Sequence, residues 1–517
     1  MSTAVYKEDE QAITQSGIWL VRACLVYLSL PILIFVSYWL NTGAALLFAT
    51  LLIYGSYVSW SSEEPPGSAY EVFANLMTTH AIPFCLFFVW CALSGTGGIG
   101  FQNTDYAASN ALLKDLIENP WPLQMKGNIP LVYYVSYYLP AALIGKLTNW
   151  TIANLFIFIW TFVGLSLVWS VLCLALKLTT LSRAKLTFAA FIFILFGGWD
   201  ILGAALTYSS EILTPGTHIE WWASIGQFSS NTTLLFWVPQ HVIAPWLMTS
   251  LLLLLLHRGI GHKSVLFLAA CAFLWSPIAC LGLLPFIAAL FVRDIFTDKG
   301  ANFLSSANFF VPPFVALLGF LFYSSNAFNF PNEWQFSHPN FWRNYSLLFL
   351  FEILPIAVPF LVQHRKAKIF LNEINLPPPL NLSRMEKLFG WIALLSLVIL
   401  PFYKMGIMND LCMRASIPGL FILMSFWLRV FRKEFTFEYI PLAAVFICTI
   451  LGAGSAVSEI YRSFANYDVK IPDARSVGSL LTNPENSVIE QRAGNPNAFF
   501  WHWLGPINQK NLVTPKP

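Results

Sequence analysis

The sequence predicts an all-α fold, a polytopic bundle of transmembrane helices, from its composition and from its long apolar runs. The chain has 517 residues, of which 57% are hydrophobic and only 11% are charged. Soluble domains carry about 25% charged residues, so these charges are too few to coat the soluble domains that such a length would otherwise suggest. The mean hydropathy of +0.63 and the net charge of +3 also exclude a disordered chain and a protein that binds nucleic acid through a basic patch.

A transmembrane helix needs about 20 apolar residues. The run 264–292 contains Pro277 and Pro285 and is too long for one span, so we expect two short helices that turn at Ser276–Pro277. The first apolar run is longer than the apolar core of a signal peptide and follows an acidic segment, so we expect it to be a span. About 13 spans are predicted, at 18–40, 43–60, 80–95, 152–177, 186–205, 234–256, 264–275, 278–292, 308–325, 343–362, 388–403, 415–431 and 439–457.

Lys and Arg in short loops predict the orientation, because cytoplasmic loops are enriched in them. With 13 spans, all basic loops lie on the cytoplasmic side, and the aromatic loops 206–233 and 326–342 lie outside. We therefore expect a transmembrane domain at 1–457 with a cytoplasmic N-terminus, and a polar extracytoplasmic tail at 458–517 that caps the outer face. The basic loops are 177–185, 257–263, 293–299, 363–368 and 429–433.

The segment 130–147 is predicted to lie at the outer membrane face within an outer loop that spans 96–151. If this segment crossed the membrane, the basic loop 177–185 would move outside. Tyrosines and prolines also interrupt its first half. An interfacial or re-entrant helix is tolerated where protein or a wet cavity satisfies its backbone.

Ionisable residues at membrane depth are costly and are therefore candidates for function. Those at span ends gather on the outer side, which predicts an outward-facing cavity roofed by the aromatic loops. Glu352 is the exception, since it lies near mid-membrane as either a buried neutral acid or a pathway residue. The outer candidates are Asp105, Asp200, His241, Arg343, Lys404, Asn409, Asp410 and Arg414.

Asp105 follows a glycine-rich exit from a span, SGTGGIG, where the backbone can turn sharply. It precedes an amphipathic helix with Ala111, Leu112, Asp115 and Leu116 at helical spacing. An acid at this place can act as a general base or help to hold a metal ion. The alternative is a helix N-cap, which Thr104 or Asp105 could supply.

Several of the other candidate site residues allow two interpretations. Asp410 and Arg414 are four residues apart, so they form a structural ion pair or leave Arg414, with Lys404, to bind an anionic group such as a phosphate. His241 is a helix-end residue or a site residue, and Asp200 pairs with a cation or acts in the site. The stretch from His218 to His241 carries Trp222 and Gln240 among aromatic and amide residues that suit a sugar site or an interfacial belt.

Residues 85–180 resemble the first outer loop of the GT-C superfamily of integral-membrane glycosyltransferases. The resemblance rests on the early acid Asp105, the amphipathic helix, and a Pro-Leu-x-Tyr-Tyr segment that leads into the apolar stretch AALIGKL and the next span. In that family the loop holds the catalytic acid and two juxtamembrane helices. Here two spans precede the loop, and Asn103 stands where a second acid is expected, so metal use stays open. The segment residues are Pro130, Leu131, Tyr133 and Tyr134.

The resemblance implies an inverting enzyme of a bacterial inner (plasma) membrane that takes sugar from a polyprenyl-phosphate-linked donor for cell-envelope glycan or glycolipid synthesis. Asp105 would deprotonate a hydroxyl of a glycan, lipid or protein acceptor on the extracytoplasmic side. Arg414, Lys404 or Arg343 would meet the donor phosphate. No cofactor is assigned, and a divalent cation stays an alternative. The pocket would comprise Asp200, His241, Asp410, Asn409, Gln240 and Trp222.

Two other classes of membrane protein compete with this interpretation. A transporter or flippase of a lipid-linked or anionic solute would favour paired broken helices and charges at mid-depth. A polymerase or ligase of surface glycans would favour a large outer loop with several Arg and His residues. The sequence shows no internal repeat, and its long outer loops are poor in basic residues.

Overall fold

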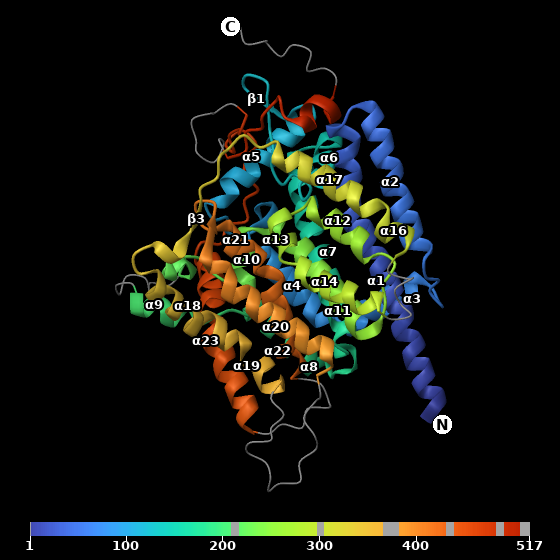
Figure 1. Cartoon of the computed structure of the whole chain (residues 1–517), viewed down its shortest axis with the longest axis vertical. Coiled ribbons are helices and arrows are strands. Elements are labelled where there is room, and N and C mark those ends of the chain that lie inside the picture. Colours follow the sequence, from blue (N-terminus) through green and yellow to red (C-terminus); the bar gives the residue numbers. More distant parts are fainter. Residues whose placement is uncertain are drawn as a thin grey trace.

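The computed structural model describes residues 2–207, 217–296, 304–364, 382–430, 439–481 and 491–506, and helices make up most of it (Figure 1). Within these residues, ten helical stretches are long and apolar enough to cross a membrane. This architecture confirms the prediction of a helical bundle and is compatible with an integral membrane protein. Four of the stretches are single helices, and a fifth is α20 (Arg384–Ile399) continued by a 3-10 turn at Leu400–Phe402. The single helices are α1 (Ser2–Trp39), α2 (Thr42–Ser61), α7 (Trp150–Ala175) and α11 (Pro239–Arg258).

The other five stretches are each interrupted by a short break. The breaks coincide with glycine, proline or a local π-helical turn, as between α18 and α19, where residues Phe349–Ile353 form such a turn. These stretches are α8 (Arg183–Leu195) with α9 (Asp200–Thr207), α13 (Pro277–Leu281) with α14 (Leu284–Ile295), α16 (Ser306–Phe309) with α17 (Val311–Ser324), α18 (Phe341–Leu348) with α19 (Leu354–His364), and α21 (Asp410–Ala415) with α22 (Ile417–Arg429).

An eleventh span is reached if α3 (Ala69–Thr79) and α4 (Ala81–Leu93), which meet at 77°, are counted as one. The predicted span 264–275 corresponds to α12 (Val265–Phe273), a helix of 9 residues. At about 1.5 Å per residue it is too short to cross a hydrocarbon core of about 30 Å alone. The predicted turn is confirmed, since α12 ends before Ser276 and α13 begins at Pro277. The predicted span 439–457 lies in α23 (Tyr439–Ala465).

Side-chain caps set several of these helix starts. Asn149 accepts a hydrogen bond from the backbone N–H of Ile152 at 3.0 Å, which caps α7. At α20, Ser383 and Glu386 form a complete capping box. Such caps replace the hydrogen bonds that the first backbone N–H groups of a helix lack.

The core is formed around α7 and α11, which pack extensively against each other. The helix α11 is buried around nearly its whole circumference. Next to it, the ring of Trp160 stacks on Tyr27 at 4.1 Å, and Trp275 stacks on Tyr27 at 5.4 Å between ring centres. Aromatic stacking of this kind adds to the burial energy and fixes the relative placement of α1 and α7.

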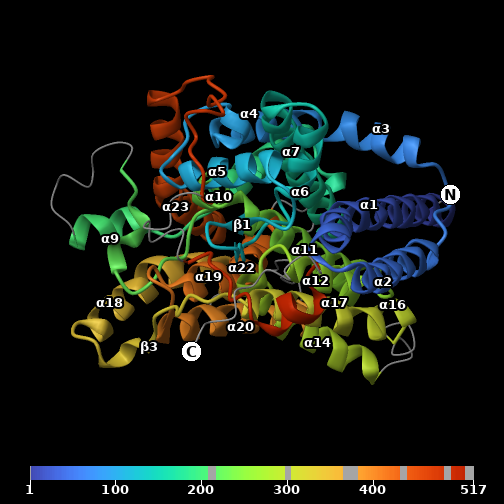
Figure 2. The same ribbon diagram turned by 90° about the horizontal axis from the view of Figure 1, so that it is seen from above.

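The predicted outer loop lies at one end of the bundle. The helices α5 (Asp105–Glu118) and α6 (Leu139–Leu147), with the strand β1 (Gln124–Met125), lie at the top in Figure 1, opposite the N-terminal end of α1. The strand β1 pairs with β2 (Ile129–Pro130). In the view from above, α5 and α6 lie across the central helices (Figure 2). As predicted, the segment 130–147 is not one of the long apolar helices among the described residues.

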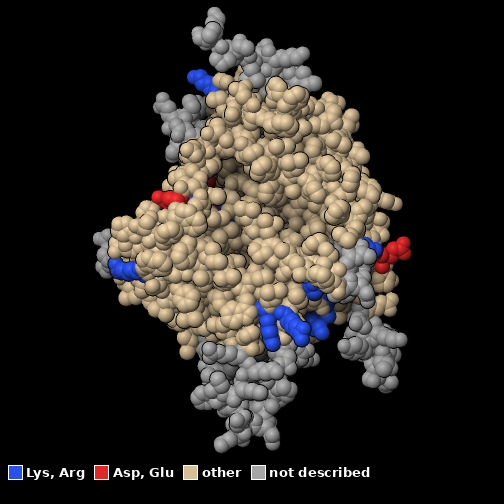
Figure 3. Space-filling view, viewed as in Figure 1, with Lys and Arg blue, Asp and Glu red and all other residues tan. Residues whose placement is uncertain are grey.

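The C-terminal tail packs against this loop. Isolated β-bridges join Leu131 to Ala493 and Ile99 to Val469. In addition, Asp115 of α5 accepts hydrogen bonds from the hydroxyl of Ser479 at 2.6 Å and the backbone N–H of Leu480 at 2.8 Å. The tail therefore contributes to the structure of this end of the bundle. On the face shown in Figure 3, basic side chains gather along the lower edge, away from this end.

Candidate functional site

Asp105 is placed by the glycine-rich turn and by the amide of Asn103. Gly95 and Gly97 have φ angles of 80° and 70°, which L side chains rarely adopt. The Asn103 side chain donates to the carbonyl of Phe236 at 2.7 Å and accepts from the backbone N–H of Asp105 at 3.0 Å. Asp105 is the first residue of α5, and its N-cap, Thr104, makes no side-chain cap. Thr104 thus occupies the N-cap position, as the alternative predicted, but its side chain makes no capping hydrogen bond.

The helix α5 has the amphipathic character that the sequence predicted. Ala111, Leu112 and Leu116 are buried against the bundle, and the Asp105 side chain is exposed. The carboxylate thus stands at the end of a helix whose apolar face is fixed in the core. A rigid support of this kind is what a catalytic group needs.

Arg414 approaches the same end of the bundle from α21. Its guanidinium forms an ion pair with Asp410 at 2.8 Å and donates to the hydroxyl of Tyr134 at 3.2 Å. The predicted pairing of Asp410 with Arg414 on one helical face is therefore confirmed. Tyr134 belongs to the Pro-Leu-x-Tyr-Tyr segment, so this segment orients the arginine.

Arg492 is a second cation in the site, and the sequence analysis did not single it out. Its guanidinium lies 3.9 Å from the ring centre of Tyr133, and only 7% of the residue is exposed. Its Nη1 is buried and has no hydrogen-bond partner among the described residues. The backbone carbonyl of Arg492 accepts from Val132 at 2.9 Å, which ties the tail to the same segment. A buried guanidinium nitrogen without a partner is costly and is suited to an anionic ligand.

These groups act on one another electrostatically. Partial burial raises the pKa of Asp105 above its ordinary value, although the side chain still reaches solvent. The positive charges of Arg414, Arg492 and His218 oppose this effect. An acid, two arginines and a histidine therefore share one region. Figure 3 shows the face hollowed near β3 (Asn332–Trp334), with acidic atoms at its rim and inside it.

His241 lies behind this region and is fully buried. Its Nδ1 is 3.1 Å from the hydroxyl of Ser276, and its ring meets Tyr134 edge-to-face at 4.5 Å. The Nε2 of His241 has no hydrogen-bond partner among the described residues. His241 therefore supports the ring that in turn holds Arg414.

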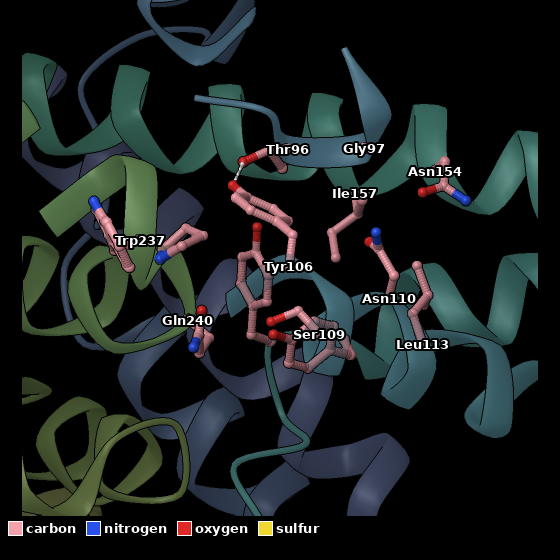
Figure 4. Close-up of a pocket in the computed structure, with 13 residues that line it drawn as sticks. Thr96, Gly97, Tyr106, Ser109, Asn110, Leu113, Asn154, Ile157, Trp237 and Gln240 are labelled. Carbon is pink, nitrogen blue, oxygen red and sulfur yellow. Dashed lines mark hydrogen bonds between the residues drawn. The ribbon is translucent and has the colours of Figure 1, made fainter. Parts of the chain in front are cut away.

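Gln240 lines a small cavity on the inner side of α5 (Figure 4). The cavity is enclosed by Tyr106, Tyr138 and Trp237 and has a volume of ≈ 20 Å³, about the space that one water molecule needs. In Figure 4 the hydroxyl of Tyr106 is hydrogen-bonded to Thr96 beside this space. The buried Oδ1 of Asn154, which also lines it, has no partner among the described residues.

Asp200 belongs to a separate buried cluster of acids, and Trp222 is one of its hydrogen-bond partners. Asp200 accepts hydrogen bonds from the indole of Trp222 at 3.2 Å and from the hydroxyl of Ser455 at 2.8 Å. Among the described residues, no cation forms an ion pair with Asp200. Glu352, which is fully buried, accepts from the backbone N–H of Phe228 at 2.9 Å. Burial and the nearby Asp200 raise the pKa of Glu220, the third acid, to about 7.

Of the remaining predicted residues, Lys404 and Asn409 have local structural partners. Lys404, on strand β4 (Tyr403–Met405), pairs with Glu333 of β3 at 3.4 Å. Arg343 is exposed on α18. Asn409 caps α21 and donates to the carbonyl of Ile225 at 2.8 Å. Of the three predicted phosphate ligands, Arg414 is the one whose charge acts on Asp105.

Asp105 is not part of a cluster of metal-ligating side chains among the described residues. Among the described residues, no group of three His, Cys, Asp or Glu side chains has the geometry to hold a metal ion. The amide of Asn103 is committed to backbone partners, and the two arginines would repel a cation.

Comparisons of the chain with models of protein families, with curated proteins and with solved structures find no match. The argument about function therefore rests on the fold and the site geometry.

Proposed function

We propose that this protein is an integral-membrane glycosyltransferase that moves a sugar from a polyprenyl-phosphate-linked donor to an acceptor hydroxyl. The observation that carries the proposal is the placement of Asp105 at the start of α5, at the end of the bundle where Tyr133 and Tyr134 hold Arg492 and Arg414, whose charges act on Asp105. A base and two guanidinium groups are the parts needed to activate a hydroxyl and to receive a phosphate leaving group.

The reaction follows from these roles. Asp105 takes the proton of the acceptor hydroxyl, and the oxygen attacks the anomeric carbon from the side opposite the phosphate. The bond between that carbon and the phosphate oxygen breaks, and the electron pair leaves with the polyprenyl phosphate. Arg492, through its unpartnered Nη1, and Arg414, through the N–H groups that Asp410 and Tyr134 leave unused, stabilise the phosphate charge by hydrogen bonds. A single displacement of this kind inverts the anomeric configuration.

The apolar bundle supports a lipid-linked donor, because a polyprenyl chain can lie in the membrane beside these helices. Tyr133 and Tyr134 hold the two arginines at the end of the bundle where α5 lies. The donor phosphate would thus stay at the interface while its chain remains in hydrocarbon. The sugar, the acceptor and the extracytoplasmic orientation belong to this proposal.

The purified protein in lipid nanodiscs should release polyprenyl phosphate from at least one of undecaprenyl-phosphate glucose, mannose and arabinose when cell-envelope extract supplies acceptors. Asp105→Asn should reduce the release by about 100-fold or more, as loss of a general base does. The matched control is Glu118→Gln, which changes the exposed acid at the other end of the same helix. Equal activity of Asp105→Asn and wild type would reject Asp105 as the base.

A transporter is the second candidate, and the buried acids favour it. Asp200 begins α9 after a break in its span, and Glu352 lies in the π-helical turn between α18 and α19. Broken helices with ionisable residues are typical of transporters. Uptake of labelled polyprenyl phosphate sugar into proteoliposomes without its cleavage would favour this candidate over the transferase.

A further inference from the structure

His218 is a titratable residue at the same end of the bundle as Asp105. It has no role in the reaction proposed above. Its Nδ1 lies 3.1 Å from Oε1 of Glu459 on α23, and 25% of its side chain is exposed. Glu459 is 3% exposed and is also bonded by Arg462. The acid is therefore fixed from two sides, and it holds the imidazole in one orientation.

A continuous set of contacts connects His218 to Asp105. The ring of His218 packs on Trp237 at 4.8 Å between ring centres. The residue before Trp237, Phe236, accepts the hydrogen bond from Asn103, which in turn binds the backbone of Asp105. Arg462 also packs on Trp237, with its guanidinium carbon 5.0 Å from the ring centre. These contacts end at the backbone of Asp105; separately, a positive charge on His218 opposes the burial that raises the pKa of the Asp105 carboxyl.

The hydrogen bond to Glu459 decides which ring nitrogen of His218 carries the proton in the neutral imidazole. A carboxylate accepts, so Nδ1 of His218 must be the N–H donor. In the neutral ring Nε2 then holds the lone pair, and it makes no hydrogen bond among the described residues. A histidine whose Nδ1 is held by a carboxylate in this way is oriented to take up a proton at Nε2.

We propose that His218, oriented by Glu459, receives the proton that Asp105 takes from the acceptor and releases it to solvent. This role rests on the proposed glycosyltransferase function. The acceptor O–H bond breaks as the Asp105 O–H bond forms. The Asp105 O–H bond then breaks, and solvent water carries the proton to Nε2 of His218, since both side chains are partly exposed. The imidazolium returns the proton to bulk water, and Asp105 is again a carboxylate.

The charges around His218 support such a cycle. Burial disfavours the imidazolium, but the hydrogen bond to Glu459 and the charges of Glu220 and Glu459 outweigh it, so the pKa of His218 lies above its ordinary value. Arg462 opposes them. Asp200 and Asp105 are the other carboxyl groups whose charges act on this histidine. The imidazolium is therefore stable enough to form and exposed enough to lose its proton.

The test measures kcat against pH in nanodiscs with the undecaprenyl phosphate sugar that the wild-type protein turns over. His218→Gln should lower kcat by about 100-fold, which is at the lower end of the range for acid–base groups, with little change in KM. Glu459→Gln removes the charge that stabilises the imidazolium, so the acidic limb of the profile should move to lower pH. The matched control is His338→Gln, since the exposed His338 also pairs with a glutamate, Glu333 of β3, at 3.1 Å.

A second measurement does not need turnover. The modification of His218 by diethyl pyrocarbonate, followed by mass spectrometry, reports the fraction of neutral imidazole at each pH. Its midpoint should fall in Glu459→Gln and stay unchanged in Glu333→Gln, which affects His338 instead. An unchanged midpoint in Glu459→Gln would overturn the orientation by Glu459, even if a variant fails in the activity assay.

The outcomes separate this inference from the proposed function. If the wild-type protein cleaves no donor, the glycosyltransferase proposal fails and the role of His218 fails with it. If the wild-type protein is active and His218→Gln keeps the wild-type kcat and pH profile, only the role of His218 is overturned. A lower kcat with a shifted acidic limb in Glu459→Gln supports both.

Discussion

Arg492 stacks on Tyr133, with the guanidinium carbon 3.9 Å from the ring centre. The next residue along the chain, Tyr134, receives a hydrogen bond from Arg414 at 3.2 Å. Two consecutive tyrosines of one segment therefore hold two arginines that come from distant parts of the sequence. The ring centres are 4.9 Å apart, so adjacent rings hold the two cations.

Arg492→Gln should weaken the binding of the polyprenyl phosphate donor by about 10-fold or more, because a hydrogen bond to a charged group contributes about 1.5–3 kcal/mol. Titration of undecaprenyl phosphate into the protein in nanodiscs measures this affinity. Arg475→Gln is the matched control, since Arg475 is an exposed arginine of the same tail. If Arg492→Gln and Arg475→Gln bind equally well, Arg492 is not a phosphate ligand.

Arg414→Ala should also weaken donor binding, and it should leave Tyr134 without its guanidinium partner. Because both arginines would contact one phosphate, the double variant with Arg492→Gln should depart from the sum of the single effects. A double-mutant cycle of binding free energies measures this coupling. Strict additivity would place the two cations in independent sites.

Asp115→Ala should loosen the tail without touching the acid or the arginines directly. The carboxylate accepts from Ser479 and Leu480, and a buried donor left without its partner costs about 1–3 kcal/mol. We expect a lower thermal midpoint and faster limited proteolysis of the tail. Glu118→Gln on the same helix should change neither, and unchanged proteolysis of Asp115→Ala would contradict the docking role.

Gly97→Ala should destabilise the turn that leads to Asp105. Gly97 has a φ of 70°, and a Cβ there would lie 2.3 Å from the carbonyl oxygen of Asn154 on α7. Crowding of this kind costs about 1–3 kcal/mol in addition to the backbone strain. Gly127→Ala is the control, because Gly127 has a φ of 86° but open space around it. Similar losses of thermal stability in both variants would show that backbone strain alone decides the effect.

Glu220→Gln should flatten the dependence of thermal stability on pH. Burial and Asp200 raise the pKa of Glu220 to about 7 in the folded protein. A carboxyl group with a raised pKa stabilises the fold at pH below its unfolded value, near 4.3, and loses this contribution as the pH rises through about 7. Unfolding of the wild-type protein between pH 4.5 and 8 should show this loss. A Glu220→Gln profile as steep as that of wild type would assign the loss to other groups.

The sequence by itself determined the helical architecture. Long apolar runs can satisfy their backbone polar groups only within helices when no water is present, so the run lengths set most spans to within a few residues. The amphipathic spacing after Asp105 and the four-residue interval from Asp410 to Arg414 likewise predicted a helix face and an ion pair that the structure shows. Against about 13 predicted spans, ten stretches among the described residues are long and apolar enough to cross a membrane, and α12 is too short to span alone.

Tertiary structure alone decided which charges share a site. Arg492 lies in a polar tail that carries no periodic signal, and it reaches Tyr133 only because the tail pairs with residues near Leu131. Lys404 looked equivalent to Arg414 in the sequence, yet its strand directs it to Glu333. Glu220 and His218 became notable only when folding buried one beside Asp200 and fixed the other on Glu459. Spacing along a helix fixes local neighbours, whereas contacts between distant segments depend on how the helices and the tail pack.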